Sequence, residues 1–525
     1  MRGMTAPPTT SVRGVNGAVS AAEQLATNAG IAILQAGGNA VDAAIATNAV
    51  MAAVAPHQCG MGGDLFALVH HDGETVALNA SGRAGSGADA DGLRGAGHTE
   101  MPLHHDIRVV TVPGCVDGWV TLHDRFGTMP LGDLLAPAIR LAECGFPASP
   151  LLTWSLRRLD DRGAEQLATL APGLHTGARV VREGVARALR AVGEGGRSAF
   201  YEGDFGSGLI GLGNGLFTHE DLERSQADWV DPLSTAAFGL DLHTIPPNSQ
   251  GYLTLGALRL AEQVGLPDDP DDPQWAHVLI ECATAAGFDR PTVLHDRADG
   301  RALLDAIDGR SDLVDRHKSS QRHGPGDRGD TTYLCAVDGE RMGVSLIQSN
   351  ASGLGSWIAE PSTGINLHNR GLGFSLEAGH PAEYGPGRRP PHTLSPALAS
   401  RNGELVSVFG TMGGDAQPQI LLQVAARLFH HGQSPNRALD AGRWALAGPS
   451  TGFDTWTSGV VPTVEVEGQA PEQWIVDLAR RGHSVELLPA YDSGFGHAHA
   501  IVVGDDGVLA GMADPRTVVG RCAAI

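Results

Sequence analysis

The chain has 525 residues, of which 42% are hydrophobic and 18% are charged, and its formal net charge is −22. These proportions are globular and exclude a disordered chain, and the length allows one large domain or several ordinary ones. The negative charge argues against nucleic acid or an anionic membrane as a partner. The negative net charge does not exclude a small anionic substrate, provided that an arginine near the site binds it.

Lysine and cysteine usage narrows the chemistry further. Lys318 is the only lysine, which argues against a P-loop or a pyridoxal Schiff base. The six cysteines are far apart and form no CxxC pair, so we expect reduced core thiols. We see no apolar run typical of a signal peptide and no segment near the ~20 apolar residues of a membrane span. We therefore expect a cytoplasmic protein, and we expect no cofactor.

The N-terminal part of the chain predicts two helices and a hairpin. A capping box at 20–23 (SAAE) starts a helix that runs to about residue 35. A second, Ala-rich helix follows at 40–55, and its apolar residues lie almost all round, which predicts burial between layers. Strands at 65–70 and 75–78 form a hairpin that leads to Arg83.

The middle of the chain is mostly helical, and short strands appear in its last third. Helices are expected at 114–119, 131–144, in the 180s, at 252–264 and at 277–288, and later at 418–429 and 471–481. Strands are expected at 333–337, 342–347, 406–409, 461–466, 484–488 and 498–503. The only convincing linker is 308–330, and there is no internal repeat. This mixture favours a single two-part domain of the α+β class with its sheets inside.

The stretch from Gly324 to Asn350 carries the main chemical signal. Its polar, Gly-rich start predicts exposed chain up to Asp330, and Thr331 and Thr332 then open a buried strand. A cut before Thr331 would place a new α-amine beside the Thr331 hydroxyl. That amine, with an unperturbed pKa of ~7.7–8.0, could act as the base for its own hydroxyl. A Thr-Thr pair at a strand start is also common without any chemistry.

Three weaker patterns have structural interpretations. His497 and His499 alternate along a strand and so point to one face, but no third ligand accompanies them, so we predict no metal site. Cys335 is expected to be a buried structural thiol. Asp514-Pro515-Arg516 predicts a turn with a local ion pair.

Several stretches, in order along the chain from about residue 15 to the end, resemble the γ-glutamyltransferase family of N-terminal nucleophile hydrolases. They are GGNAVDAAIA (37–46), GMGGDLF (60–66), VPGCVDGW (112–119), PPNSQG (246–251), HVLIECATAAGFDR (277–290), GDTTYLCAVD (329–338), TLSP (393–396), GTMGGDAQPQ (410–419) and ADPR (513–516). The resemblance implies a four-layer αββα sandwich. It also implies a proenzyme that cuts itself between Asp330 and Thr331. The fragments 1–330 and 331–525 would stay together as a heterodimer and one structural domain.

The resemblance assigns roles to individual residues. Thr331 would be the nucleophile, and Ser349, with Asn350 beside it, would support the nucleophile. The amides of Gly413 and Gly414 would form the oxyanion hole; a tight turn before a helix is the alternative. Arg83 would hold a substrate carboxylate, although an arginine after a turn is often only a surface residue.

Two departures from the family pattern bear on the substrate. Arg370 to Gly373 stand where paired acids bind the substrate amine, and His392-Thr393 stand where paired serines contact the substrate. Amide hydrolysis is therefore better supported than γ-glutamyl specificity. We predict a self-processing γ-glutamyltransferase or glutathione hydrolase-like enzyme that cleaves γ-glutamyl or related amides through a threonyl acyl-enzyme.

Two alternatives stay open at this point. One is an acylase or amidohydrolase of the same family that acts on glutaryl or oxamoyl amides. The other is an uncleaved member that only binds a carboxylate ligand. The expected partners are a small amide substrate with a carboxylate and the two fragments of the chain itself. A higher oligomer is possible, and neither nucleic acid nor a membrane is expected.

Overall fold

A computed structural model describes residues 10–170, 173–322, 331–447 and 461–525. Its centre is a pair of seven-stranded sheets whose neighbouring strands all run antiparallel. The first sheet has the order β1 (Val12–Gly14), β18 (Leu509–Ala513), β17 (Ala498–Val503), β13 (Glu404–Thr411), β12 (Ala397–Arg401), β9 (Leu240–Thr244) and β8 (Leu233–Ala237). The second has the order β19 (Arg521–Ala524), β2 (Gly17–Ala21), β10 (Thr332–Asp338), β11 (Gly343–Ser349), β3 (Asp64–His71), β4 (Glu74–Ala80) and β7 (Asp228–Val230).

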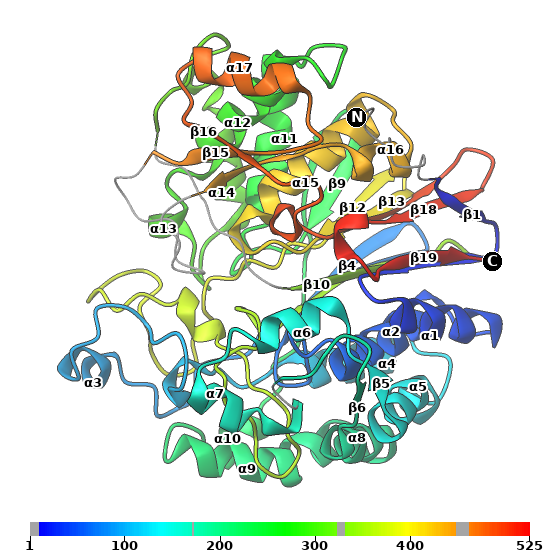
Figure 1. Ribbon diagram of the computed structural model, residues 1–525, viewed down its shortest axis with the longest axis vertical. Coiled ribbons are helices and arrows are strands. Elements are labelled where there is room, and N and C mark those ends of the chain that lie inside the picture. The colour runs from blue at the N-terminus through cyan, green and yellow to red at the C-terminus, as the bar shows by residue number, and fades with distance from the viewer. Residues whose placement is uncertain (1–9, 171–172, 323–330, 448–460) are drawn as a thin grey trace.

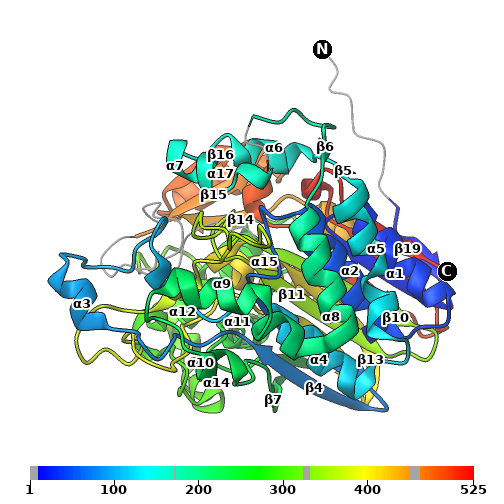
Figure 2. The ribbon, with the colours of Figure 1, turned by 90° about the horizontal axis from the view of Figure 1, so that it is seen from below.

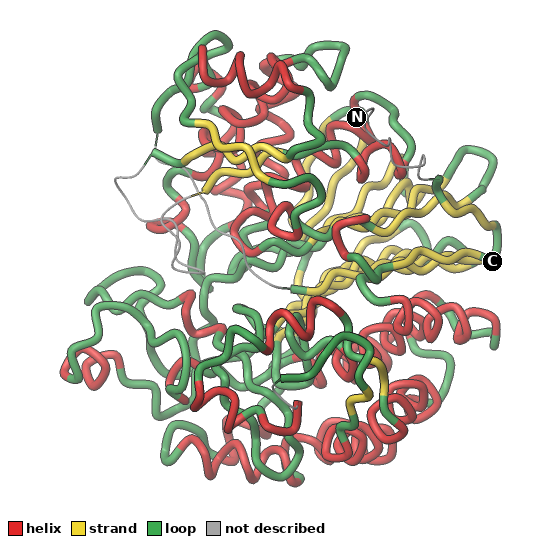
Figure 3. Tube along the Cα trace, in the orientation of Figure 1, coloured by secondary structure: helices red, strands yellow, loops and turns green. Residues whose placement is uncertain are grey.

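Helices cover the outer face of each sheet, above and below the strands in Figure 1. The helices on the side of the second sheet are α1 (Gln24–Gln35), α2 (Ala40–Val54), α4 (Cys115–Phe126), α5 (Leu131–Cys144) and α8 (Glu183–Tyr201). Those on the side of the first sheet are α11 (Tyr252–Val264), α12 (Pro273–Gly287), α15 (Gln417–Ala425) and α17 (Glu472–Arg480). Figure 3 shows the same separation of red helices and yellow strands. The predicted four-layer αββα sandwich is confirmed.

Smaller elements surround this frame, several of them visible from below in Figure 2. The short helices are α3 (Ala90–Gly95), α6 (Pro150–Leu156), α7 (Asp161–Gln166), α9 (Asp204–Gly213), α10 (His219–Glu223), α13 (Arg290–Val293), α14 (Gly300–Asp308) and α16 (Pro435–Asp440). A three-stranded sheet holds β14 (Trp444–Ala447), β15 (Thr463–Glu467) and β16 (Val485–Leu488), and a two-stranded one holds β5 (Phe146–Pro147) and β6 (Arg179–Val180). No described helix combines the length and the apolar composition that a membrane span needs.

Strand β10 is buried on both faces, which explains its nearly continuous apolar sequence. Tyr333, Cys335 and Val337 pack in the core between the two sheets. Leu334 and Ala336 point the other way, into the core under the helices. Cys335 is therefore the structural thiol that the sequence predicts, and burial raises the pKa of its thiol well above the ordinary value.

The sequence was wrong about the start of α1. Ser20 does not cap the helix but lies in β2, because β2 pairs with β10 and β19 as far as Ala21. Its hydroxyl donates to the Met512 carbonyl at 3.1 Å. Glu23 is the N-cap instead, and its carboxylate accepts the Leu25 amide at 3.3 Å.

Two further expectations have mixed outcomes. The ion pair in the Asp514 turn is confirmed, with Arg516 Nη1 at 3.0 Å from Asp514 Oδ1. It belongs to a larger buried cluster, because Arg443 Nη2 lies 2.7 Å from the same carboxylate and Arg516 Nε donates to Glu467 at 2.7 Å. All six cysteines are free, but Cys144 is exposed and so is not a core thiol.

The close approach of the two sheets beside β10 generates a stability prediction. A Cβ on Gly410 in β13 would lie 2.2 Å from the ring of Tyr333. We expect Gly410→Ala to destabilise the fold by about 1–3 kcal/mol, the usual effect of overpacking a core, and so to lower the midpoint of thermal unfolding. Gly211→Ala is the control, since Gly211 is exposed in α9 with no atom within 4 Å of its Cβ position. Equal midpoints for both variants would contradict this account of the packing.

Candidate active site

Thr331 precedes β10 directly and is completely buried. The register of β10 and β11 pairs Thr332 with Gln348, which places Thr331 opposite Ser349. The two hydroxyl oxygens are 3.0 Å apart. Ser349 Oγ also accepts the Ala351 amide at 2.8 Å, and either hydroxyl of the Thr331–Ser349 pair can be the donor between them. Thr331 and Ser349 are therefore in contact, while their roles as nucleophile and supporting hydroxyl stay predictions. Asp330 lies outside the described residues.

Asp64 is the buried carboxylate next to this pair, because the register of β11 and β3 sets it opposite Ser349. Asp64 Oδ1 accepts the amides of Gly82 at 2.9 Å and Gly114 at 3.3 Å. Burial works against its charge, but His368 and His392 outweigh that effect and lower the pKa of Asp64 to about 2. The carboxylate is thus ionised and holds several chain segments together at one end of the sheet.

His392 is part of this framework rather than a base. Its Nε2 lies 3.2 Å from Asp64 Oδ2, and its Nδ1 accepts the Leu394 amide at 3.3 Å. Burial, aided by the nearby Arg370, lowers the pKa of His392 to about 3. The imidazole is therefore neutral at pH 7, with both ring nitrogens used inside the protein. The predicted substrate contacts of His392 and Thr393 stay predictions.

Gly413 and Gly414 form the turn between β13 and α15. Their φ angles of +140° and +55° are ones that side chains rarely adopt, so this turn requires glycine. Gln250 Nε2 donates to the carbonyls of Gly414 and Thr393, both at 3.1 Å. Neither glycine amide donates a hydrogen bond to another described residue. The two amides are therefore available as the donors of an oxyanion hole.

Buried charges next to this turn are matched within the protein. Asp415 Oδ1 lies 3.2 Å from Arg290 Nη2, and both side chains are buried. Arg370, at the start of the 3-10 helix Arg370–Gly373, donates from Nη1 to Thr393 Oγ1 at 3.2 Å. Burial lowers the pKa of Arg370 only to about 10, so it stays charged at pH 7. A cation therefore occupies the segment Arg370–Gly373, at which the family resemblance would place amine-binding acids.

Arg83 lies beyond the end of β4, on the same sheet as Thr331 but three strands away, a separation of ~14 Å at the usual strand spacing. Its Nη2 lies 2.6 Å from Asp228 Oδ2, and its Nη1 donates to the Ser225 carbonyl at 3.1 Å. Arg389 Nη1 lies 2.8 Å from the same carboxylate. Two cations thus share one anion, and the predicted role of Arg83 stays a prediction.

The other predicted residues have structural partners. Asn350 Nδ2 donates to the Pro56 carbonyl at 3.0 Å, which turns this side chain toward the loop before β3. His497 Nε2 lies 2.8 Å from Ser493 Oγ, and His499 Nδ1 lies 3.2 Å from Ser20 Oγ. The two histidines therefore contact different segments and do not converge on one point.

Sequence reasoning gave no role to Asp64 and Gln250. Both lie in motifs on which the family resemblance rests, GMGGDLF and PPNSQG, so the sequence did contain a signal for these two residues. Their partners His392, Thr393 and Gly414 lie between 143 and 328 residues away in sequence, however, and no local pattern names them.

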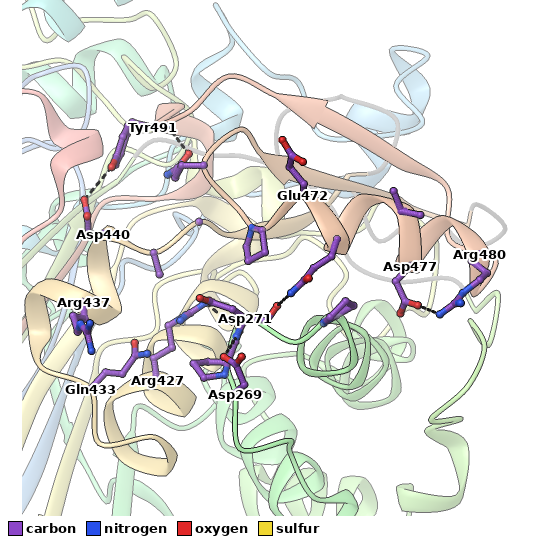
Figure 4. Close-up of a pocket in the computed structure, with 18 residues that line it drawn as sticks. Asp269, Asp271, Arg427, Gln433, Arg437, Asp440, Glu472, Asp477, Arg480 and Tyr491 are labelled. Carbon is purple, nitrogen blue, oxygen red and sulfur yellow. Dashed lines mark hydrogen bonds and ion pairs between the residues drawn. The ribbon is translucent and has the colours of Figure 1, made fainter. Parts of the chain in front are cut away.

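A separate surface pocket of about 1400 Å³ lies at the outer helical layer, away from this cluster. Figure 4 shows its mixed lining of acids and arginines from the loop before α12, from α16 and from α17. Of the lining residues, Gln473 Nε2 donates to the Asp271 carbonyl at 2.9 Å. None of the candidate catalytic residues lines this pocket, so it is not the active site.

Comparison with known proteins agrees with this geometry. The family model "Gamma-glutamyltranspeptidase" matches residues 26–524. A glutathione hydrolase-like proenzyme of Bacillus subtilis is 34% identical over 96% of this chain and 98% of its own length. An oxamate amidohydrolase proenzyme of Klebsiella pneumoniae is 33% identical over 96% of this chain and 97% of its own length. The crystal structure of a cephalosporin acylase from Bacillus halodurans is 32% identical, with a TM-score of 0.90 over 100% of this chain and 99% of that one. The chain therefore belongs to the gamma-glutamyltranspeptidase family.

Proposed function

We propose that the protein is a self-processing amide hydrolase that cleaves γ-glutamyl or related amides through an acyl ester on Thr331. The observation that carries this proposal is the Thr331 hydroxyl, held 3.0 Å from Ser349 Oγ at the very start of a buried strand. Relatives whose names include "proenzyme" support the self-processing part. The alternative of an uncleaved binding protein gains no support from them.

Processing and turnover would use the same hydroxyl. Attack of Thr331 Oγ1 on the Asp330 carbonyl would form an ester and free the Thr331 amine, and water would then release the preceding fragment. In turnover the free amine takes the hydroxyl proton while the oxygen attacks the substrate carbonyl. The Gly413 and Gly414 amides would stabilise the resulting oxyanion; losing one such donor typically costs ~2.7–4 kcal/mol. The proton passes to the leaving amine, and water hydrolyses the ester.

The finer features of the assembly belong to the same proposal. The fragments 1–330 and 331–525 would remain one folded body, because β10 and β11 of the later fragment lie between β2 and β3 of the earlier one. Separating them would break a continuous sheet. Association into a higher oligomer and a cytoplasmic location also stay proposals.

We further propose that the acyl group of the substrate carries a carboxylate and needs no α-amine. Arg83 and Arg389 share the single carboxylate of Asp228, which leaves local positive charge for an anion. Asp415, the acid directly after the glycine turn, is paired with Arg290. An ammonium group without a partner would have to stay hydrated or lose solvation energy. The names of the oxamate amidohydrolase and cephalosporin acylase relatives favour such substrates for those proteins.

Replacement of the nucleophile tests the central proposal. Thr331→Ala is expected to remain a single uncut chain on a denaturing gel and to have no amidase activity, because it lacks the attacking oxygen. Thr331→Ser keeps a hydroxyl and is expected to cut and turn over more slowly. Two fragments from Thr331→Ala, the second starting at residue 331, would refute the proposal.

The pH dependence tests the free amine as the base. His392 and Asp64, with pKa values of about 3 and about 2, keep the same charge above pH 5. The rate should therefore rise with pH through a single ionisation, that of the amine, because only the deprotonated amine accepts a proton. Its midpoint should lie near ~7.7–8.0 if unshifted, and burial and neighbouring arginines would lower it. A flat rate from pH 5 to 9, with chemistry rate-limiting, would contradict this assignment.

Specificity is tested with Arg83→Ala. Losing one partner of a buried charge pair typically costs ~3–5 kcal/mol, so kcat/KM for a glutaryl anilide should fall on the order of a hundredfold or more, with self-cleavage intact. Asp228→Asn is the matched control, because it removes the ionic partner of Arg83 but keeps the guanidinium. If Asp228→Asn is as damaging as Arg83→Ala, Arg83 acts through Asp228 and not through the substrate.

The same assay addresses the substrate amine. For the unmodified enzyme, kcat/KM for glutaryl and γ-glutamyl anilides should agree within about tenfold, or about 1.4 kcal/mol. A preference of a hundredfold or more for the γ-glutamyl anilide would mean that an acid binds the amine, and this part of the proposal would fail.

A further inference from the structure

Three side chains that the proposed reaction does not use converge at the outer face of the first sheet. They are His277 and Glu281, one turn apart on α12, and His483 in the connection between α17 and β16. Within the described residues this is the group of three metal-ligating side chains whose donor atoms lie within 4.8 Å of one another. His277 and Glu281 are 0% and 2% exposed, and the His483 side chain is 4% exposed.

We propose that these three residues bind one divalent metal ion of the zinc class. His277 Nδ1 lies 2.9 Å from His483 Nε2, and His483 Nε2 lies 3.9 Å from Glu281 Oε1. Zinc binds histidine nitrogen at ~2.0–2.1 Å and carboxylate oxygen at ~2.0–2.2 Å, so ligand atoms in a tetrahedral site are roughly 3.3 Å apart. These two separations lie on either side of that value, and all three donor atoms lie within 4.8 Å of one another, so small side-chain movements would bring them around one ion.

The surroundings orient the ligands as a metal site requires. His277 Nε2 lies 2.8 Å from the Asp315 carbonyl, which can only accept, so the Nε2 proton is placed there and the Nδ1 lone pair faces the cluster. A backbone carbonyl on the far nitrogen is the usual way to fix a metal-binding imidazole. Glu281 accepts the Ser320 amide at 3.1 Å, which orients its carboxylate.

The charge and protonation of the three groups also suit a cation. Burial lowers the pKa of His277 and of His483 to about 4, so both imidazoles are neutral ligands at pH 7. Burial raises the pKa of Glu281 to about 7, against the opposing effects of the Ser320 hydrogen bonds and of Arg322. A bound divalent ion would add positive charge beside this carboxylate. A cavity of about 10 Å³, room for about one water, lies beside Glu281 and His483; Arg322 also lines it, whereas His277 does not.

The position of the cluster gives the ion a role. His277 and Glu281 precede Thr331 and His483 follows it, so the ion would link the two fragments. This consequence rests on the proposed cleavage, whereas metal binding itself does not. Segment 315–321 is held at the same place, since the Ser319 amide donates to the Arg481 carbonyl at 2.8 Å and Gln321 Nε2 to the Gly482 carbonyl at 2.6 Å. The ion would thus fix the chain shortly before the cleavage region.

A hydrogen bond from His483 to His277 is the competing explanation, and the variant His483→Gln separates the two. Glutamine keeps a donor for His277 Nδ1 but is a poor zinc ligand. The full-length chain, stripped with EDTA and reloaded with Zn²⁺, is passed through gel filtration, and its metal content is measured. We expect about one Zn²⁺ per chain, at least tenfold weaker binding in His483→Gln and Glu281→Gln, and no change in His317→Ala, which alters an exposed histidine nearby.

Cobalt substitution and unfolding complete the test. Bound Co²⁺ should give the intense visible bands of a four- or five-coordinate site, and His483→Gln should abolish them. EDTA should lower the unfolding midpoint of the unmodified protein but not that of His483→Gln. The uncut Thr331→Ala chain should bind the ion equally, so a failure of cleavage would not disturb the result. Less than about 0.2 Zn²⁺ per chain, or Co²⁺ bands that persist in His483→Gln, would overturn the proposal.

Discussion

The pairing of β10 with strands on both sides is the constraint on which the rest of the structure depends. β2 and β11 fix the backbone of β10 in register, and the two cores on its faces fix its side chains. Thr331 stands at the start of this strand, so its hydroxyl has little freedom relative to Ser349. A nucleophile held in this way needs little further ordering before reaction, which is how positioning lowers a barrier.

Burial of the site also means that its charged side chains need partners within the protein. A buried ion is costly unless protein groups replace its solvation, and the structure meets this cost locally. Asp64 is held by backbone amides and by His392, and Asp415 is held by Arg290. Asp64 and Asp415 thus both have partners within the protein, which is why we propose that neither binds a substrate ammonium group. Substrate preference within this family would then depend on where a chain leaves an acid or a base unmatched, while the threonine and the glycine turn remain the same.

The proposed division of the chain at Thr331 would turn several internal contacts into contacts between two fragments. The two sheets and the helical layers interleave segments from both sides of Thr331, so the fragments would share cores rather than a flat interface. The cluster of His277, Glu281 and His483 adds a polar link to these apolar ones, in the outer layer and away from the nucleophile. Its residues come from α12 and from the turn before β16, two elements to which the proposed reaction assigns no role.

The sequence alone determined the fold class, most helices and strands, the candidate nucleophile and the glycine turn. It could do so because periodicity, turn residues and local motifs record backbone preference and burial over short distances. Only the tertiary structure decided that Ser20 lies in a strand, that Asp64 meets His392, that Arg83 is held by Asp228 and that Asp415 is taken by Arg290. These outcomes depend on the order and register of strands that are far apart in sequence. Whether a side chain acts as a helix cap, a ligand or a structural contact therefore depends on the neighbour that the sheet places beside it.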